Sequence, residues 1–124
     1  MTDLTNITIS SSASFAADRI METNLFKQKS DVLMFAAGFM IKYHLQDFYP
    51  VTYTLADSEG SNYAFSTFDT DGKWATLIRA LYTECNTPYL YLRALMDKGL
   101  LLIDQRIQDD PGYTLISELN AVAR

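Results

Sequence analysis

The chain has 124 residues, of which 48% are hydrophobic, 13% aromatic and 20% charged. This length fits one globular domain and excludes a multidomain enzyme. The small number of Gly and Pro residues and the high aromatic content exclude a collagenous or disordered chain. Fifteen acidic against ten basic residues give a formal net charge of −5, which opposes binding to the phosphate backbone of nucleic acids. We therefore expect one compact acidic domain.

Cysteine content and hydropathy predict a cytoplasmic protein. The only cysteine, Cys85, has no partner for an internal disulfide, and the first residues lack the features of a secretion signal. The longest apolar run covers residues 32–41, about half of what a membrane-spanning helix needs. This run predicts a buried helix, so we expect no membrane association.

The first half of the chain predicts two helices. Residues 1–10 indicate a tail or a short edge strand, and residues 11–124 indicate a single globular domain. Serines at positions 10–12 can cap a helix that ends near residue 23. A second helix, capped by Ser30, is expected from Asp31 to about Leu45. It is apolar on nearly all sides, and its small residues 36–38 predict the close approach of another helix.

The middle of the chain predicts a β-hairpin followed by an amphipathic helix. Residues 51–56 and 61–68 both alternate apolar and polar side chains, and residues 57–60 form a turn sequence. The helix is expected from about Lys73 to Cys85, with Asp69 or Asp71 as its cap.

Two structures fit the C-terminal part. A helix capped by Thr87 carries Pro88 in its first turn and is expected to end near Gly99. Residues 100–104 fit either a strand or a continued helix, residues 109–112 form a turn, and residues 117–124 fit a short helix. The strand alternative gives a winged-helix-like C-terminal part. The predicted fold class is α+β and mainly helical, with four to five helices and a central β-hairpin.

No motif points to catalysis, so we predict that the protein is not an enzyme. Phosphate-binding loops, paired-Cys motifs and nucleophile elbows are absent from the sequence. His44 is the only histidine and suits the C-terminal end of a helix, and Cys85 is expected to be buried and inert. The string from Asp69 to Gly72 fails as a calcium loop, because two ligand positions would be Thr67 and Ile78. We predict no metal and no cofactor.

Acidic and aromatic residues are concentrated in one segment. Residues 45–72 contain five acidic residues and no Lys or Arg, so this segment accounts for the whole formal charge of −5. Turns and a helix N-terminus would explain most of these acids. Exposed Tyr and Phe beside acids instead suit a protein interface. On this second interpretation the candidate partner-binding residues are Asp57, Glu59, Tyr63, Phe65, Asp69 and Asp71.

One segment resembles a known family. Leu25-Phe26, a polar spacer and residues 31–39 (DVLMFAAGF) resemble the opening motif of small associated proteins encoded in bacterial DNA-phosphorothioation and related anti-phage defence clusters. Beyond this motif the resemblance covers only the order of elements. The family's basic stretch after the motif is replaced here by residues 43–49, so a contact made through it does not carry over. The motif itself predicts core packing and transfers no functional residue.

Together these observations favour a non-enzymatic accessory or regulatory subunit of a bacterial or phage-related DNA defence system. It would act by protein–protein interaction, with a larger nucleic-acid-processing or defence protein as partner. One alternative is a winged-helix-like transcriptional or nucleic-acid adaptor, and another is an acidic phage-type inhibitor of a nucleic-acid-binding protein. A homodimer through the same aromatic surface is a further alternative.

Overall fold

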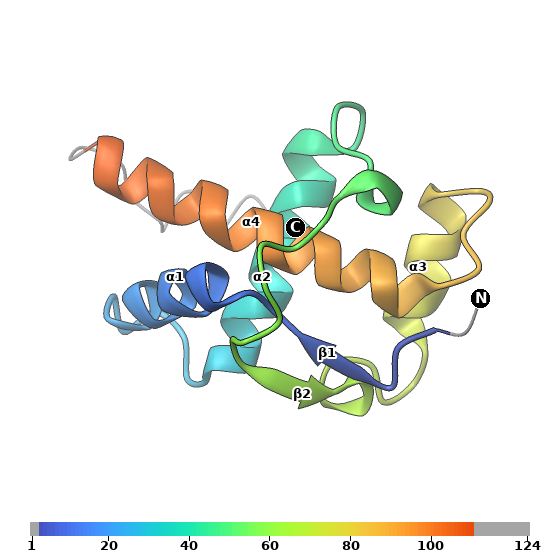
Figure 1. Ribbon diagram of the computed structural model, residues 1–124, viewed down its shortest axis with the longest axis horizontal. Helices are drawn as coiled ribbons and strands as arrows, with labels where there is room; N and C mark the ends of the chain where they lie inside the picture. Colours follow the sequence, from blue (N-terminus) through green and yellow to red (C-terminus); the bar gives the residue numbers. More distant parts are fainter. Residues whose placement is uncertain (1–2, 111–124) are drawn as a thin grey trace.

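The structure is a computed structural model that describes residues 3–110 (Figure 1). In this range it is mainly helical, with two short antiparallel strands and two 3-10 turns. This confirms the α+β, mainly helical class. The elements in chain order are β1 (Asn6–Thr8), α1 (Ser11–Met21), α2 (Lys29–His44), η1 (Pro50–Thr52), β2 (Asn62–Ala64), η2 (Phe65–Thr67), α3 (Lys73–Leu81) and α4 (Pro88–Asp109).

Helix α4 lies at the centre of the domain and packs against α1, α2 and α3 (Figure 1). Its inner face buries apolar residues on both sides of Gly99, and the helix continues to Asp109. The expected end near Gly99 is therefore wrong, and the helical alternative for residues 100–104 is confirmed. The strand that a winged-helix-like part needs there is absent from the described chain. The predicted helix 117–124 lies outside the described residues.

Helices α2 and α4 approach each other closely because both carry small residues at the contact. A Cβ atom added at Gly99 would overlap the carbonyl oxygen of Ala36 and would lie 2.9 Å from its carbonyl carbon. The expected close approach of a helix to the small residues of α2 is confirmed at Ala36. Half of the residues of α2 are buried, among them Phe35 and Phe39.

The strand pairing differs from the expected hairpin. β2 pairs with β1, in the register Ile7 to Tyr63, and not with residues 51–56. The latter contain η1 and irregular chain, so the hairpin between residues 51–56 and 61–68 is wrong. Residues 51–56 alternate apolar and polar side chains because Tyr53 and Leu55 turn toward the domain, where they are half-buried. The segment nevertheless forms no strand. No helix in the described range is long and apolar enough to cross a membrane.

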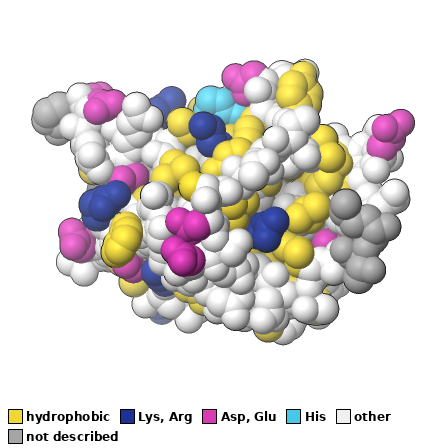
Figure 2. All heavy atoms as spheres, viewed as in Figure 1, with side chains coloured by type: hydrophobic (Ala, Val, Ile, Leu, Met, Phe, Trp, Pro, Cys, Tyr) yellow, Lys and Arg dark blue, Asp and Glu magenta, His cyan; other side chains and the backbone are white. Residues whose placement is uncertain are grey.

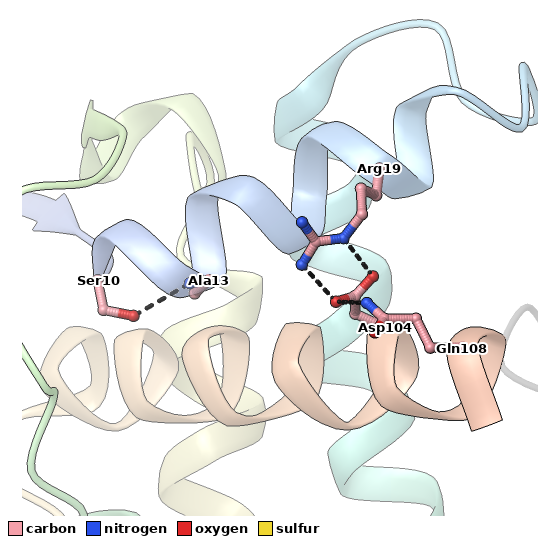
Figure 3. Close-up of polar contacts among 5 residues, drawn as sticks. All are labelled: Ser10, Ala13, Arg19, Asp104 and Gln108. Atoms are coloured by element: carbon pink, nitrogen blue, oxygen red, sulfur yellow. Dashed lines mark hydrogen bonds and ion pairs between the residues drawn. The ribbon is translucent and has the colours of Figure 1, made fainter.

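An ion pair ties α1 to α4 (Figure 3). The guanidinium of Arg19 donates two hydrogen bonds to the buried carboxylate of Asp104, at 2.9 and 2.5 Å, and Gln108 donates a third at 2.8 Å. The hydrogen bond to Asp104 raises the pKa of Arg19. The N-terminus of α1 is capped as predicted, because the hydroxyl oxygen of Ser10 accepts from the N–H of Ala13 at 3.2 Å. α1 is thus fixed at both ends.

The other helix starts are capped differently from the predictions. α2 begins at Lys29, and Ser30 lies inside the helix, so Ser30 is not its N-cap. The Thr87 side chain makes no capping hydrogen bond to α4. The carboxylate of Asp3 takes that role and accepts from the N–H groups of Tyr89 and Leu90, each at 3.0 Å. α3 ends at Leu81, four residues before the expected end.

Candidate protein-contact surface

Two of the six predicted partner-binding residues lie beside the start of α1. Asp57 accepts hydrogen bonds from the N–H of Ser11 at 2.8 Å, from its hydroxyl at 2.7 Å and from the N–H of Glu59 at 3.0 Å. The pKa of Asp57 is lowered, mainly by the hydrogen bond from the Ser11 hydroxyl and further by those from the two N–H groups. The oxygens of Asp57 are therefore engaged in stabilising a helix N-terminus. Glu59 is exposed.

We expect Asp57→Asn to reduce the loss of stability in acid. The pKa of Asp57 is lowered in the folded state. The contribution of this carboxylate to the stability of the fold is therefore fully present above the pKa of an unfolded Asp, about 4, and is lost as the pH falls through the lowered value. Urea unfolding between neutral pH and strong acid should show a flatter acid limb for the variant. The matched control is Glu59→Gln, which should keep the steep limb. Equal acid limbs for wild type and Asp57→Asn would contradict the capping role.

Asp69 and Asp71 lie at the N-terminus of α3, as the capping interpretation expected. Asp69 is only 3% exposed and accepts from the N–H groups of Trp74 at 2.8 Å and Ala75 at 3.1 Å. It also accepts from the Tyr89 hydroxyl at 2.9 Å. Asp71 is exposed and accepts from the N–H of Lys73 at 3.2 Å. Burial places Asp69 out of reach of a partner protein.

Tyr63 and Phe65 are half-buried and pack within the domain. The ring of Tyr63 lies 5.3 Å from that of Phe68, and the ring of Phe65 lies 4.7 Å from that of Tyr89. Burial, followed by the hydrogen bond to Asp69, raises the pKa of Tyr89 to about 12. Phe65 and Asp69 therefore meet at Tyr89, whereas Asp57 and Glu59 lie at the start of α1.

The aromatic and acidic segment is divided between separate parts of the molecule (Figure 1). Residues 48–53 pack beside α4, where η1 contacts this helix. Residues 62–68 include β2 and η2 and lie on the other side of the domain, next to β1. The aromatic residues of the first part are thus separated from Tyr63 and Phe65 in the second.

A different group of large apolar side chains is exposed. Tyr49 is 62% exposed and Val51 is 67% exposed, on either side of the buried Pro50. Tyr43, near the end of α2, is 41% exposed. Figure 2 shows hydrophobic side chains gathered over the loop that follows α2 and continuing toward α4. Residues 49–51 are called the recognition turn below.

The recognition turn is held by contacts on its inner side. Backbone hydrogen bonds run from the N–H of Thr52 to the carbonyl of Tyr49 at 3.1 Å and from the N–H of Tyr53 to that of Pro50 at 3.2 Å. The Tyr53 ring packs against Phe48, with 5.5 Å between ring centroids. Its hydroxyl donates to the buried Asp97 at 2.5 Å. Burial and this hydrogen bond raise the pKa of Tyr53.

A groove of about 310 Å³ lies where the C-terminal ends of α2 and α4 meet. Phe39 and Leu102 provide apolar walls, and the guanidinium of Arg106 lies 5.4 Å from the centre of the Phe39 ring. The Phe39 ring is also close to that of Tyr43, with 5.1 Å between ring centroids. Tyr43 therefore connects the exposed aromatic surface to a groove whose remaining lining residues are polar or charged.

Sequence reasoning placed an interface in residues 45–72 but selected other residues of this segment, because it assigned Val51 to a half-buried strand. The signal that could have identified it is Pro50, which interrupts a strand and places apolar neighbours in a turn. His44 lies at the C-terminal end of α2, as expected, and its Nδ1 lies 3.1 Å from Asp47. Cys85 is buried, and burial raises its pKa.

Within residues 3–110 no three His, Cys, Asp or Glu side chains are grouped so that they could hold a metal ion. Comparison with protein-family models, curated proteins and solved structures finds no match to this chain.

Proposed function

We propose that this protein acts by binding another protein through the recognition turn and Tyr43. The observation that carries the proposal is the 62% and 67% exposure of Tyr49 and Val51 on a turn whose inner side is anchored. Tyrosine is among the residues that most often dominate binding energy in protein interfaces, because it buries a large area with few rotatable bonds.

The anchoring of the turn supports recognition in a second way. Binding costs free energy when flexible side chains and loops must be ordered. Here Pro50 is buried, and Tyr53 is hydrogen-bonded to α4, so the backbone of the turn is already fixed. Such pre-organisation leaves more of the contact energy for affinity.

We infer the biological setting from the resemblance of residues 25–39 to small proteins of anti-phage defence clusters. In this setting the protein is a cytoplasmic, non-enzymatic accessory subunit, and its partner is a larger protein of a nucleic-acid-processing or defence complex. The recognition turn replaces the acidic residues as the proposed contact, because Asp57 and Asp69 use their oxygens within the domain.

The proposal predicts that Tyr49→Ala strongly weakens partner binding. Tagged wild-type protein, expressed in the organism that encodes it, should capture one protein in a fixed molar ratio, and Tyr49→Ala should weaken this capture at least about tenfold. Phe15→Ala is the matched control, since Phe15 on α1 is 61% exposed and belongs to a different element. The capture should be unchanged for Phe15→Ala, and both variants should keep wild-type thermal stability.

Two results would contradict the proposal. One is a partner captured equally by wild type and Tyr49→Ala, and the other is the absence of any partner in a fixed ratio. Size-exclusion chromatography separates a further case: a homodimer that Tyr49→Ala converts to a monomer would identify a second copy of the chain as the occupant of the surface.

A further inference from the structure

A buried carboxylate of α4 lies behind the recognition turn. Asp97 is fully buried, and its oxygens accept hydrogen bonds from two segments that are distant in sequence. The hydroxyl of Tyr53 donates to Oδ1 at 2.5 Å, and the N–H of Ser10 donates to Oδ2 at 2.7 Å. In the described part of the chain no Lys, Arg or His forms an ion pair with this carboxylate.

Burying a carboxylate without a positive partner is costly, so its two hydrogen-bond donors matter for the whole site. Hydrogen bonds to an ionised acceptor are stronger than those between neutral groups. If one donor is removed, the carboxylate becomes less well satisfied, and its remaining bond and side-chain position should change as well.

We propose that Asp97 is a positioning residue, which fixes the recognition turn through Tyr53 and couples it to the start of α1 through Ser10. This inference rests on the proposed function of the turn. Asp97 makes no contact with a partner itself, because it is fully buried.

The chain between the turn and β2 supports this coupling. After Tyr53 the backbone returns to the residues that precede α1: the N–H of Gly60 donates to the carbonyl of Ile9 at 3.0 Å. The N–H of Ile9 in turn donates to the carbonyl of Ser61 at 3.1 Å. At Gly60 a Cβ would lie 2.6 Å from the carbonyl oxygen of Ile9, so the two backbones are in direct contact. Segment 53–61 is therefore tied to residues 9 and 10 at both of its ends.

The first test compares two tyrosine variants by amide hydrogen exchange. Tyr53→Phe removes only the hydroxyl bonded to Asp97, whereas the matched control Tyr82→Phe removes a buried hydroxyl that has no hydrogen-bond partner in the described structure. We expect exchange about tenfold faster in Tyr53→Phe at the amides of residues 52 and 53 and also of Ser10. Tyr82→Phe should leave all three unchanged.

Unchanged exchange in Tyr53→Phe would overturn the inference. A change confined to residues 52 and 53 would overturn the coupling to α1. Both variants keep the aromatic ring and should fold, so a failure of folding does not obscure the comparison.

The second test measures capture of the partner at a temperature where every variant is folded. A purely structural role of the hydroxyl would lower stability without changing capture, whereas positioning predicts capture about tenfold weaker in Tyr53→Phe and unchanged in Tyr82→Phe. If Tyr49→Ala abolishes capture but Tyr53→Phe alters neither capture nor exchange, the positioning role is wrong and the proposed function stands. If Tyr53→Phe accelerates exchange at both sites but neither variant affects capture, the link between Asp97 and the turn stands and the proposed function fails.

Discussion

Gly99→Ala is expected to lower the free energy of unfolding by about 3 kcal/mol. The new methyl group would overlap the carbonyl oxygen of Ala36 and would lie 3.0 Å from the side chain of Met40. The Met40 side chain can turn aside, but the Ala36 carbonyl is part of the helix backbone, so α2 and α4 as whole helices must move apart along a contact that is central to the core. The better helix propensity of Ala returns only about 1 kcal/mol. Urea or thermal unfolding followed by circular dichroism measures the loss.

Gly72→Ala provides the comparison for this prediction. Gly72 has φ of 78°, and no atom would lie within 4 Å of an added Cβ. Its replacement should therefore cost only the strain of a left-handed backbone, about 1 kcal/mol. Equal losses for the two variants would show that α2 and α4 do not require a glycine at their contact.

The sequence predicted the helices better than the strands for a physical reason. Helical periodicity and helix-starting residues such as Ser10 and Pro88 are local signals, so the starts of α1 and α4 and the course of α2 follow from neighbouring residues. Pairing of β1 with β2 joins Thr8 to Asn62, which are far apart in sequence. The alternation at residues 51–56 indicated a nearer partner, but its half-buried residues pack on α4 through Tyr53 and form no strand.

The acidic residues illustrate the same limit at the candidate site. Composition correctly located the excess of acids at residues 45–72, but it could not separate carboxylates that face solvent from those that satisfy N–H groups elsewhere. Asp57 caps α1, whose first residue, Ser11, is 46 positions earlier in the sequence. Asp3 caps α4 at Tyr89, 86 positions later. Such long-range caps need the tertiary structure. Asp69, only five residues before Trp74, was within the range of local reasoning.

Asp69→Ala should be the second strongly destabilising substitution, with a loss of about 3 kcal/mol. It removes the acceptor of two N–H groups of α3 and of the Tyr89 hydroxyl. These donors lie in a part-buried site, where a lost partner leaves a desolvated polar group. The loss should appear as a lower midpoint in urea with an unchanged slope. In the same variant the pKa of Tyr89, now about 12, should fall, because one cause of its rise is the bond to Asp69.

Asp71→Ala tests whether the effect depends on burial or only on the presence of an acid near α3. Asp71 is exposed, and its carboxylate accepts only a long hydrogen bond, at 3.2 Å, from the N–H of Lys73. Its replacement should therefore lower the free energy of unfolding by only about 0.5 kcal/mol. A double-mutant cycle of Asp69→Ala with Tyr89→Phe isolates the hydroxyl contribution. A coupling free energy near zero between Asp69 and Tyr89 would mean that Asp69 does not join α3 to α4. Equal losses of unfolding free energy for Asp69→Ala and Asp71→Ala would mean the same. The expected coupling of about 1 kcal/mol would instead place this carboxylate among the contacts that hold the two helices together.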